Sequence, residues 1–326
     1  MNRRALISLI GGALAWPLAA RAQQGERVRR IGWLIDRDEN DVAVRAYRTT
    51  LLDALAKVGW IEGRNLRIDA RFGARDPNLI RDLAAELIGL APEVIVTNGG
   101  VTTRHLQQLT RTIPIVFTAG PEPVDAGLVR NIARPEGNTT GFPTFEPSIG
   151  SKWLELLKGA APSLARASIV LNPESNAQSV GDIEAVASTL NIQAIKTPVR
   201  NSLDAVRAID AFAAEPNGGL VVMPPPPNLA VREAILELAA QHRLPLIAGY
   251  REMAAAGGLM SYGRIFGDEF RGAASYVDRL LRGGKVNELP VQFPTRYELV
   301  INLKTARAIG LAIPGELLAR ADEVIE

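Results

Sequence analysis

Residues 31–72 read IGWLIDRDENDVAVRAYRTTLLDALAKVGWIEGRNLRIDARF and contain the unit that decides the fold. The first five residues, 31–35, are an unbroken apolar run, which is typical of a buried strand. Within 42–58 the apolar residues recur at helical spacing, and residues 66–72 then alternate with period two, as in a half-exposed strand. A strand, a helix and a second strand in this order predict a crossover between parallel strands.

The same alternation continues along the chain. Asp76 and Pro77 open a helix as its cap and first residue, and that helix should end before Pro92. Further strands are predicted at 94–96, 115–117, 168–171, 193–197, 220–223 and 246–247, with helices at 177–190, 202–214 and 229–242. Two series of similar order predict an α/β fold of two lobes with parallel sheets, joined near Gly141–Pro147.

The remainder of the chain predicts further passages between these lobes. A helix with one apolar face follows Gly263 and ends at Gly283 and Gly284. Residues 289–300 are expected to be extended, and short helices are expected at 303–309 and 316–321. A chain that completes its second lobe and then supplies more elements should cross between the lobes again.

The first 22 residues have the anatomy of an export signal. Arg3 and Arg4 precede an apolar run over 5–20, and Ala20-Arg21-Ala22 forms an A-x-A cleavage site. The alternatives are an N-terminal membrane anchor and a buried helix, but the run is short and rich in Gly and Pro for a membrane span. We expect a soluble, periplasmic protein without a lipid anchor, exported by either the general or the twin-arginine route.

Composition excludes several classes of function. The precursor carries 37 Lys and Arg against 35 Asp and Glu, so loss of the signal arginines leaves a net charge near −1 and no basic excess for nucleic acid. The absence of cysteine excludes thiolate metal ligands and a cysteine nucleophile. No G-x-S-x-G, H-E-x-x-H or phosphate-binding glycine motif occurs, and the only histidines are His105 and His242. We therefore predict no enzyme activity, no catalytic residues, no metal site and no cofactor.

Small and polar residues follow the predicted strands, at the sheet edge where ligands bind in open parallel sheets. The predicted ligand-binding residues are Asp36, Asn98, Gly99, Gly100, Thr118, Ala119 and Gly120 from the first series, and Asn172, Ser175, Asn176, Pro224 and Tyr250 from the second. Glycines let a backbone approach a ligand, and the free N–H groups of a following helix can hold a carboxylate. Asp36 could pair with an ammonium group, and Tyr250 could stack on a flat ligand.

Each of these residues also has a purely structural interpretation. Asn98, Thr118 and their neighbours could serve as helix caps and turn residues, which every strand-to-helix connection needs. Asp36 could belong to a solvated acidic loop, Tyr250 could be packed over the second lobe, and the prolines from Pro224 onward could be a rigid connector. The whole set facing one cleft favours binding.

Several long segments together resemble one known family. They are ALAWPLAARAQQ at 13–24, PIVFT at 114–118, RPEGN at 134–138, AGGLMSYG at 256–263 and FPTRYELVINLKTA at 293–306. With these segments the chain from Ile31 to Glu326 is similar to ABC-transporter substrate-binding proteins of the tryptophan- and tyrosine-binding type. The family often has Asn-Ser-Ala after its first strand, where this chain has the acidic run from Asp36.

The resemblance implies a type I periplasmic-binding-protein fold of two Rossmann-like lobes joined by three crossings, near Phe142, Gly263 and Val291. The lobes would be residues 28–142 with 264–290, and 143–263 with 291–326. It implies a monomer that captures a small molecule, such as an amino acid or an aromatic acid, by hinge closure and presents it to an ABC permease. The alternative is a periplasmic sensor that docks on a membrane signalling receptor.

Overall fold

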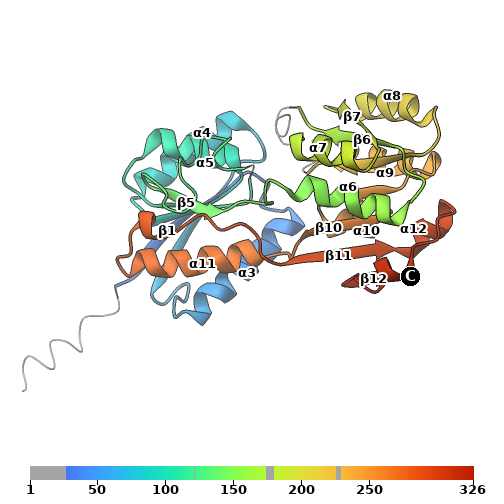
Figure 1. Cartoon of the computed structure of the whole chain (residues 1–326). Helices are drawn as coiled ribbons and strands as arrows, with labels where there is room; N and C mark the ends of the chain where they lie inside the picture. The colour runs from blue at the N-terminus through green and yellow to red at the C-terminus, as the bar shows by residue number, and fades with distance from the viewer. Residues whose placement is uncertain (1–26, 121, 174–179, 225–228) are drawn as a thin grey trace, which may run out of the picture.

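The computed structural model describes residues 27–120, 122–173, 180–224 and 229–326. It contains two sheets, each covered by helices, in two lobes that lie side by side in Figure 1. The predicted export signal, Ser175 and Asn176 lie outside the described residues. Within the described part of the chain, no helix is long and apolar enough to cross a membrane.

The first lobe is built on a five-stranded parallel sheet of order β2-β1-β3-β4-β5. Its elements are β1 (Arg29–Ile35), α3 (Val42–Lys57), β2 (Leu66–Phe72), α4 (Pro77–Gly89), β3 (Val94–Asn98), α5 (Gly100–Leu109), β4 (Ile115–Thr118) and β5 (Thr139–Phe142). The carboxylate of Asp41 caps α3, and that of Asp76 caps α4 with Pro77 at its start. The predicted strands and helices of this series are confirmed, and β5 is an addition that the sequence did not reveal.

The second sheet has the order β12-β11-β10-β9-β8-β6-β7. Its lobe contains α6 (Ile149–Ala160), β6 (Arg166–Leu171), α7 (Gly181–Thr189), β7 (Gln193–Pro198), α8 (Ser202–Ala213), β8 (Gly218–Val222), α9 (Leu229–Gln241), β9 (Leu246–Ala248), α10 (Arg251–Ala255) and β10 (Met260–Arg264). After α11 (Asp268–Leu281) and the single turn η1 (Val286–Glu288) come β11 (Tyr297–Asn302), α12 (Leu303–Ala308), α13 (Gly315–Leu318) and β12 (Glu323–Ile325). Strands β7-β6-β8-β9-β10 repeat the order of the first sheet, which confirms the predicted likeness of the two series.

The chain passes between the lobes three times. It leaves the first sheet after β5, returns after β10 to form α11, and goes back to the second sheet at β11. Helix α11 belongs to the first core, because Phe270 and Val277 are buried there with Trp33; Figure 1 shows it beside α3. The predicted extended stretch 289–300 becomes strand only from Tyr297.

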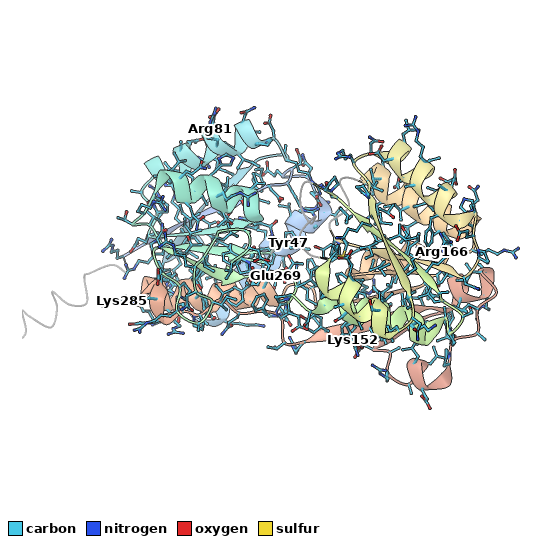
Figure 2. The ribbon with its side chains drawn as sticks, turned by 45° about the horizontal axis from the view of Figure 1, so that its top comes forward. Tyr47, Arg81, Lys152, Arg166, Glu269 and Lys285 are labelled. Carbon is cyan, nitrogen blue, oxygen red and sulfur yellow. The ribbon has the colours of Figure 1, made fainter. Side chains whose placement is uncertain are left out.

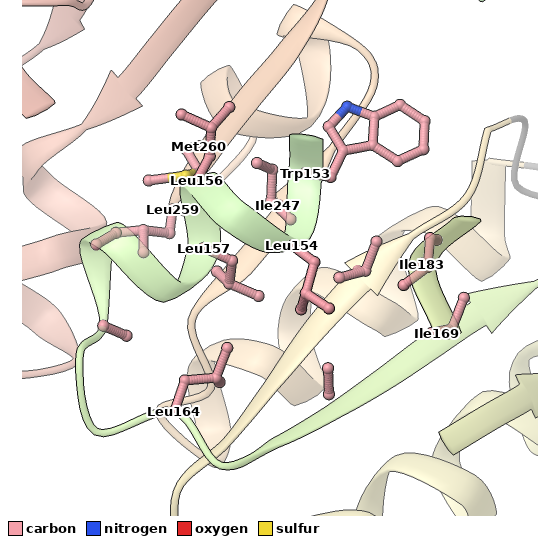
Figure 3. Packing of buried hydrophobic residues seen from close by; sticks show 14 of the residues in the cluster. Trp153, Leu154, Leu156, Leu157, Leu164, Ile169, Ile183, Ile247, Leu259 and Met260 are labelled. Atoms are coloured by element: carbon pink, nitrogen blue, oxygen red, sulfur yellow. The ribbon is translucent and has the colours of Figure 1, made fainter. Parts of the chain in front are cut away.

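Helix α6, which the sequence analysis missed, fills the core of the second lobe. Trp153, Leu154 and Leu157 are buried against Ile169 and Ile247 of the sheet, as Figure 3 shows. Burying apolar area of this kind contributes roughly 25 cal/mol per Å². Each lobe therefore has its own core, and the carboxyl ends of its central parallel strands are left to carry the polar loops.

Candidate ligand-binding site

The loops after β1, β3 and β4 meet at one edge of the first sheet. A Cβ atom placed on Gly99 would lie 3.2 Å from Oδ2 of Asp36, and one on Gly120 would lie 3.5 Å from the amide nitrogen of Gly100. Gly99 and Gly120 have φ values of 97° and 132°, which side chains rarely adopt. The structure thus brings Asp36, Gly99, Gly100 and Gly120 together, and the positive φ values favour glycine at positions 99 and 120.

The side chains of Asn98 and Thr118 are engaged within the sheet edge. The amide of Asn98 donates to the carbonyl (3.2 Å) and hydroxyl (3.4 Å) oxygens of Thr118, whose hydroxyl donates to the carbonyl of Thr97 (3.1 Å). Both residues are buried. They position the loops that follow them, and a direct contact of either side chain with a ligand stays a prediction. Ala119, next along, has a φ of 61° and donates its N–H to Phe142.

Helix α5 begins at this edge without a side-chain cap. Its N-cap residue is Gly99, and the hydroxyls of Thr102 and Thr103 donate to carbonyl oxygens rather than accepting from the first amides. Helices α3 and α4 of the same lobe are both capped by aspartate. The first N–H groups of a helix have no partner within it and carry partial positive charge. The beginning of α5 is therefore suited to hold an anion.

Asp36 is the charged group at this edge. Its Oδ1 atom is buried, and no hydrogen-bond partner for it lies in the described part of the chain. Burial raises the pKa of the Asp36 carboxyl, and the nearby Arg37 and Arg75 oppose that rise. A buried carboxylate oxygen without a partner is costly, and a ligand ammonium would remove that cost.

The edge of the second lobe supplies aromatic surface. Tyr250, at the start of α10, lies with its ring centroid 5.7 Å from that of Phe145, which in turn lies 5.4 Å from Trp153. A Cβ atom on Gly249 would lie 2.8 Å from both of these latter rings and 3.1 Å from Pro224. Burial raises the pKa of Tyr250 to about 12, so its phenol stays neutral. Pro224 and Tyr250 thus share one surface, and Asn172 directly follows β6.

The structure adds functional candidates that the sequence analysis missed. A cavity of about 70 Å³ lies between the lobes, lined by Tyr47 of α3, Tyr250, Arg251 and Glu252 of the second lobe, and Arg264 and Phe266 of the second crossing. Figure 2 shows Tyr47 and Glu269 on the side of the first lobe that faces the second. Tyr47 fits the helical apolar period and gave no separate signal in the sequence. Arg264 directly follows the segment AGGLMSYG, which indicated a family but no role for this arginine.

Other candidate sites lie elsewhere or are absent. A cavity of about 260 Å³ opens at the amino ends of β8 and β9, lined in part by Asn217, His242 and Arg243, and it contains none of the predicted site residues. His242 pairs there with Asp210 at 2.7 Å. No group of three or more acidic, histidine or cysteine side chains in the described ranges could hold a metal ion.

Comparison with known proteins gives the relatives of this chain. A curated tyrosine-binding protein of Clostridioides difficile (strain R20291) is 24% identical over 285 residues, covering 86% of this chain and 80% of the relative. A conserved domain protein of Vibrio cholerae superposes with a TM-score of 0.82 at 28% identity, over 91% of this chain and all of that one. An ABC domain from Streptococcus pneumoniae in complex with L-Trp gives 0.80 at 20% identity, over the same shares.

The two structures are of the type I periplasmic-binding-protein fold, which confirms the predicted fold class. The family model described as ABC transporter substrate binding protein matches residues 39–325. That family consists of solute-binding proteins and not of enzymes. This chain therefore belongs to the ABC transporter substrate-binding protein family.

Proposed function

We propose that this protein captures an amino acid between its two lobes and delivers it to an ABC permease for import. The observation that carries the proposal is the pairing, at one sheet edge, of the buried Asp36 carboxylate with the uncapped start of α5. An α-amino acid presents an ammonium group and a carboxylate close together. Asp36 complements the ammonium group, and the start of α5 complements the carboxylate. An aromatic acid without an ammonium group would leave Asp36 unpaired, so we favour the amino acid.

The relatives support this ligand class. One is named a tyrosine-binding protein, and the streptococcal structure holds L-Trp. The aromatic surface of Phe145 and Tyr250 on the second lobe could cover a flat side chain while the first lobe holds the amino and carboxylate groups. Closure would then bring both sets of contacts onto one ligand.

The proposed lobes are residues 28–142 with 264–290, and 143–263 with 291–326. The sheet to which each strand belongs supports this division. At the third passage Val291 and Gln292 still donate backbone hydrogen bonds to Ile132 and Gly141 of the first lobe. The residues free to bend in closure would therefore be those just after Gln292.

The proposal has three further parts. The protein is exported to the periplasm, acts as a monomer and works with a permease. Residues 1–22 support export, because a basic segment, an apolar run and an A-x-A site follow in order. N-terminal sequencing of the exported protein should begin at Gln23. A full-length chain that stays in the cytoplasm would contradict this part of the proposal.

A ligand screen tests the central claim. The mature chain is heated with each of the twenty L-amino acids and, separately, with benzoate and phenylacetate. A ligand present at 100 times its Kd stabilises the native state by about 2.7 kcal/mol, which raises the melting temperature by a measurable amount. We expect a rise with one or more amino acids and none with the acids that lack an ammonium group. No rise with any amino acid would overturn the proposal.

A further inference from the structure

Arg264 is a buried cation in the region where the two lobes are joined. It ends β10, where the chain leaves the second lobe for α11, and its side chain is only 8% exposed. Its Nη1 pairs with the carboxylate of Glu269, which is 3% exposed. The Nε–H of Arg264 is also buried, and the described part of the chain offers it no hydrogen-bond acceptor. Leaving such a donor unpaired is unfavourable, because its hydration is lost without replacement.

Arg264 is also one of the residues that line the cavity between the lobes. Tyr47 contributes a wall from the first lobe and Tyr250 a wall from the second. Both phenols lie within electrostatic range of Arg264 and also of Arg37, the neighbour of Asp36 in the chain. A space of about 70 Å³ is large enough for a group of a few atoms at the end of a side chain, and Tyr250 belongs both to its lining and to the proposed amino-acid site.

The charges around the cavity restrict what that group can be. Glu269 neutralises the guanidinium, and Arg251 on the cavity wall is paired with Glu323. Glu252 and Glu298, which also line the cavity, add negative charge. A second carboxylate on the ligand would be repelled, and a cationic side chain would offer no acceptor to the free Nε–H. A neutral oxygen, in an amide, a hydroxyl or a phenol, satisfies the donor without adding charge.

We infer that Arg264 is a specificity-determining residue that donates a hydrogen bond from Nε to a neutral oxygen at the side-chain end of the ligand. The inference rests on the proposed function and narrows the ligand to amino acids with a neutral oxygen in the side chain. Selectivity of this kind is strong, because a ligand lacking the oxygen leaves a buried donor unpaired.

Pairs of ligands that differ in this oxygen test the inference. Calorimetry compares L-tyrosine with L-phenylalanine, L-asparagine with L-leucine, and L-threonine with L-valine on the mature wild-type chain. In each pair with measurable binding we expect the oxygen-bearing member to bind at least tenfold more tightly. Equal affinities within the pairs would overturn the inference while leaving amino-acid capture intact. Failure of all six to bind would overturn the inference, and failure of all twenty amino acids in the thermal screen would overturn the proposed function as well.

Two variants separate the hydrogen bond from the ion pair. Arg264→Lys keeps a cation for Glu269 but lacks the Nε donor, and the double variant Arg264→Met with Glu269→Met removes both charges together, which avoids a lone buried ion. In either folded variant, the ratio of affinities within a pair should fall below about threefold, with the oxygen-free member little changed.

Arg296→Gln is the matched control, because Arg296 also lies where the two lobes are joined but bonds to Asp268 instead of lining the cavity. It should keep the wild-type ratio. Persistence of the ratio in Arg264→Lys, or its loss in Arg296→Gln, would overturn the assignment.

Discussion

Asp36 shows at the scale of one residue how the proposed binding site would cost stability. Its carboxylate is buried beside the start of α5, and burial raises its pKa above the ordinary value of 3.8. A folded-state pKa above the unfolded value means that the native state holds the proton more tightly. Stability contributed by the protonated group is then lost as the pH rises from 3.8 through the folded-state pKa.

Asp36→Asn should therefore stabilise the unliganded protein at neutral pH and weaken its ligand binding. Loss of a charge-assisted hydrogen bond of about 1.5–3 kcal/mol predicts roughly a 10- to 100-fold rise in Kd. The melting temperature without ligand should rise at pH 7 and show a smaller fall between acid and neutral pH than that of the wild type. Glu39→Gln, at an exposed position in the same loop, is the control and should change neither property. A lower melting temperature for Asp36→Asn at pH 7 would contradict the assigned burial cost.

Gly263 provides a second prediction at this scale. A Cβ atom on it would lie 1.9 Å from the carbonyl oxygen of Gly249, so two backbones meet there without room for a side chain. Gly263→Ala should destabilise the protein by about 1–3 kcal/mol, measured by denaturant unfolding. Gly159→Ala is the matched control, because nothing lies within 4 Å of its added Cβ and the site is helical, so alanine should stabilise by about 0.5–1 kcal/mol. Equal effects of the two substitutions would rule out the close contact.

The site could be predicted from the sequence only where local backbone rules reveal it. Asp36, Gly99, Gly100 and Gly120 follow strands, and the topology of a parallel sheet brings such positions together. Arg264 gave no such signal, because its position depends on three crossings whose geometry arises from packing between distant segments. Contact of the predicted residues with a ligand stays a prediction.

At the scale of elements, apolar runs predicted the central strands well. They did not reveal β5, whose sequence TTGF lacks an apolar run, or β10, where Ser261 and Gly263 interrupt the pattern. Both strands pair with neighbours that the apolar runs did predict, β5 with β4 and β10 with β9, and each contributes a buried side chain to a core, Phe142 and Met260 respectively. Helix α6 carries a clear apolar face but follows the predicted junction between lobes, where no predicted strand precedes it to complete a strand-to-helix unit.

The first crossing is hydrogen bonded to a loop of the proposed site. Gly120 donates its N–H to the hydroxyl of Thr144 at 2.9 Å, and the N–H of Thr144 donates back to the carbonyl of Gly120 at 3.3 Å. Thr144 is only 6% exposed. The segment after β5 and the loop after β4 are thus hydrogen bonded to each other.

Thr144→Val should break the contact between these two segments, because it removes the hydroxyl that accepts from the N–H of Gly120. Valine keeps the shape of threonine, so packing is little changed. We expect about a tenfold loss of amino-acid affinity by calorimetry, and recovery in Thr144→Ser. Thr140→Val is the matched control, since it removes a buried hydroxyl that bonds to the carbonyl of Leu289 at 2.6 Å, away from the loop. It should lower stability to a similar degree, about 1–3 kcal/mol, without loss of affinity. An equal loss of affinity in Thr144→Val and Thr140→Val would mean that lowered stability, and not the lost contact with Gly120, weakens binding.

At the scale of the whole molecule, two lobes with separate cores and repeated strand order should move as bodies in the proposed closure. The chain has no cysteine, so a pair of introduced cysteines can be labelled cleanly. With dyes at Arg81→Cys on α4 and Glu237→Cys on α9, both exposed, energy transfer should rise when a bound amino acid saturates the protein. A pair within the first lobe, Arg81→Cys and Gln108→Cys, should not change. Saturation without any change in the first pair would contradict closure.

Two of the three passages between the lobes start from the ends of paired strands. Strand β10 pairs antiparallel with β11 up to Arg264 and Tyr297, and just beyond that pair Arg296 bonds to Asp268 at 2.7 Å. A two-stranded ribbon flexes more easily across its broad face than within its plane. The two lobes should therefore rotate relative to each other about one preferred axis, which runs parallel to the width of the ribbon. A solute would then enter and leave on one side of the molecule.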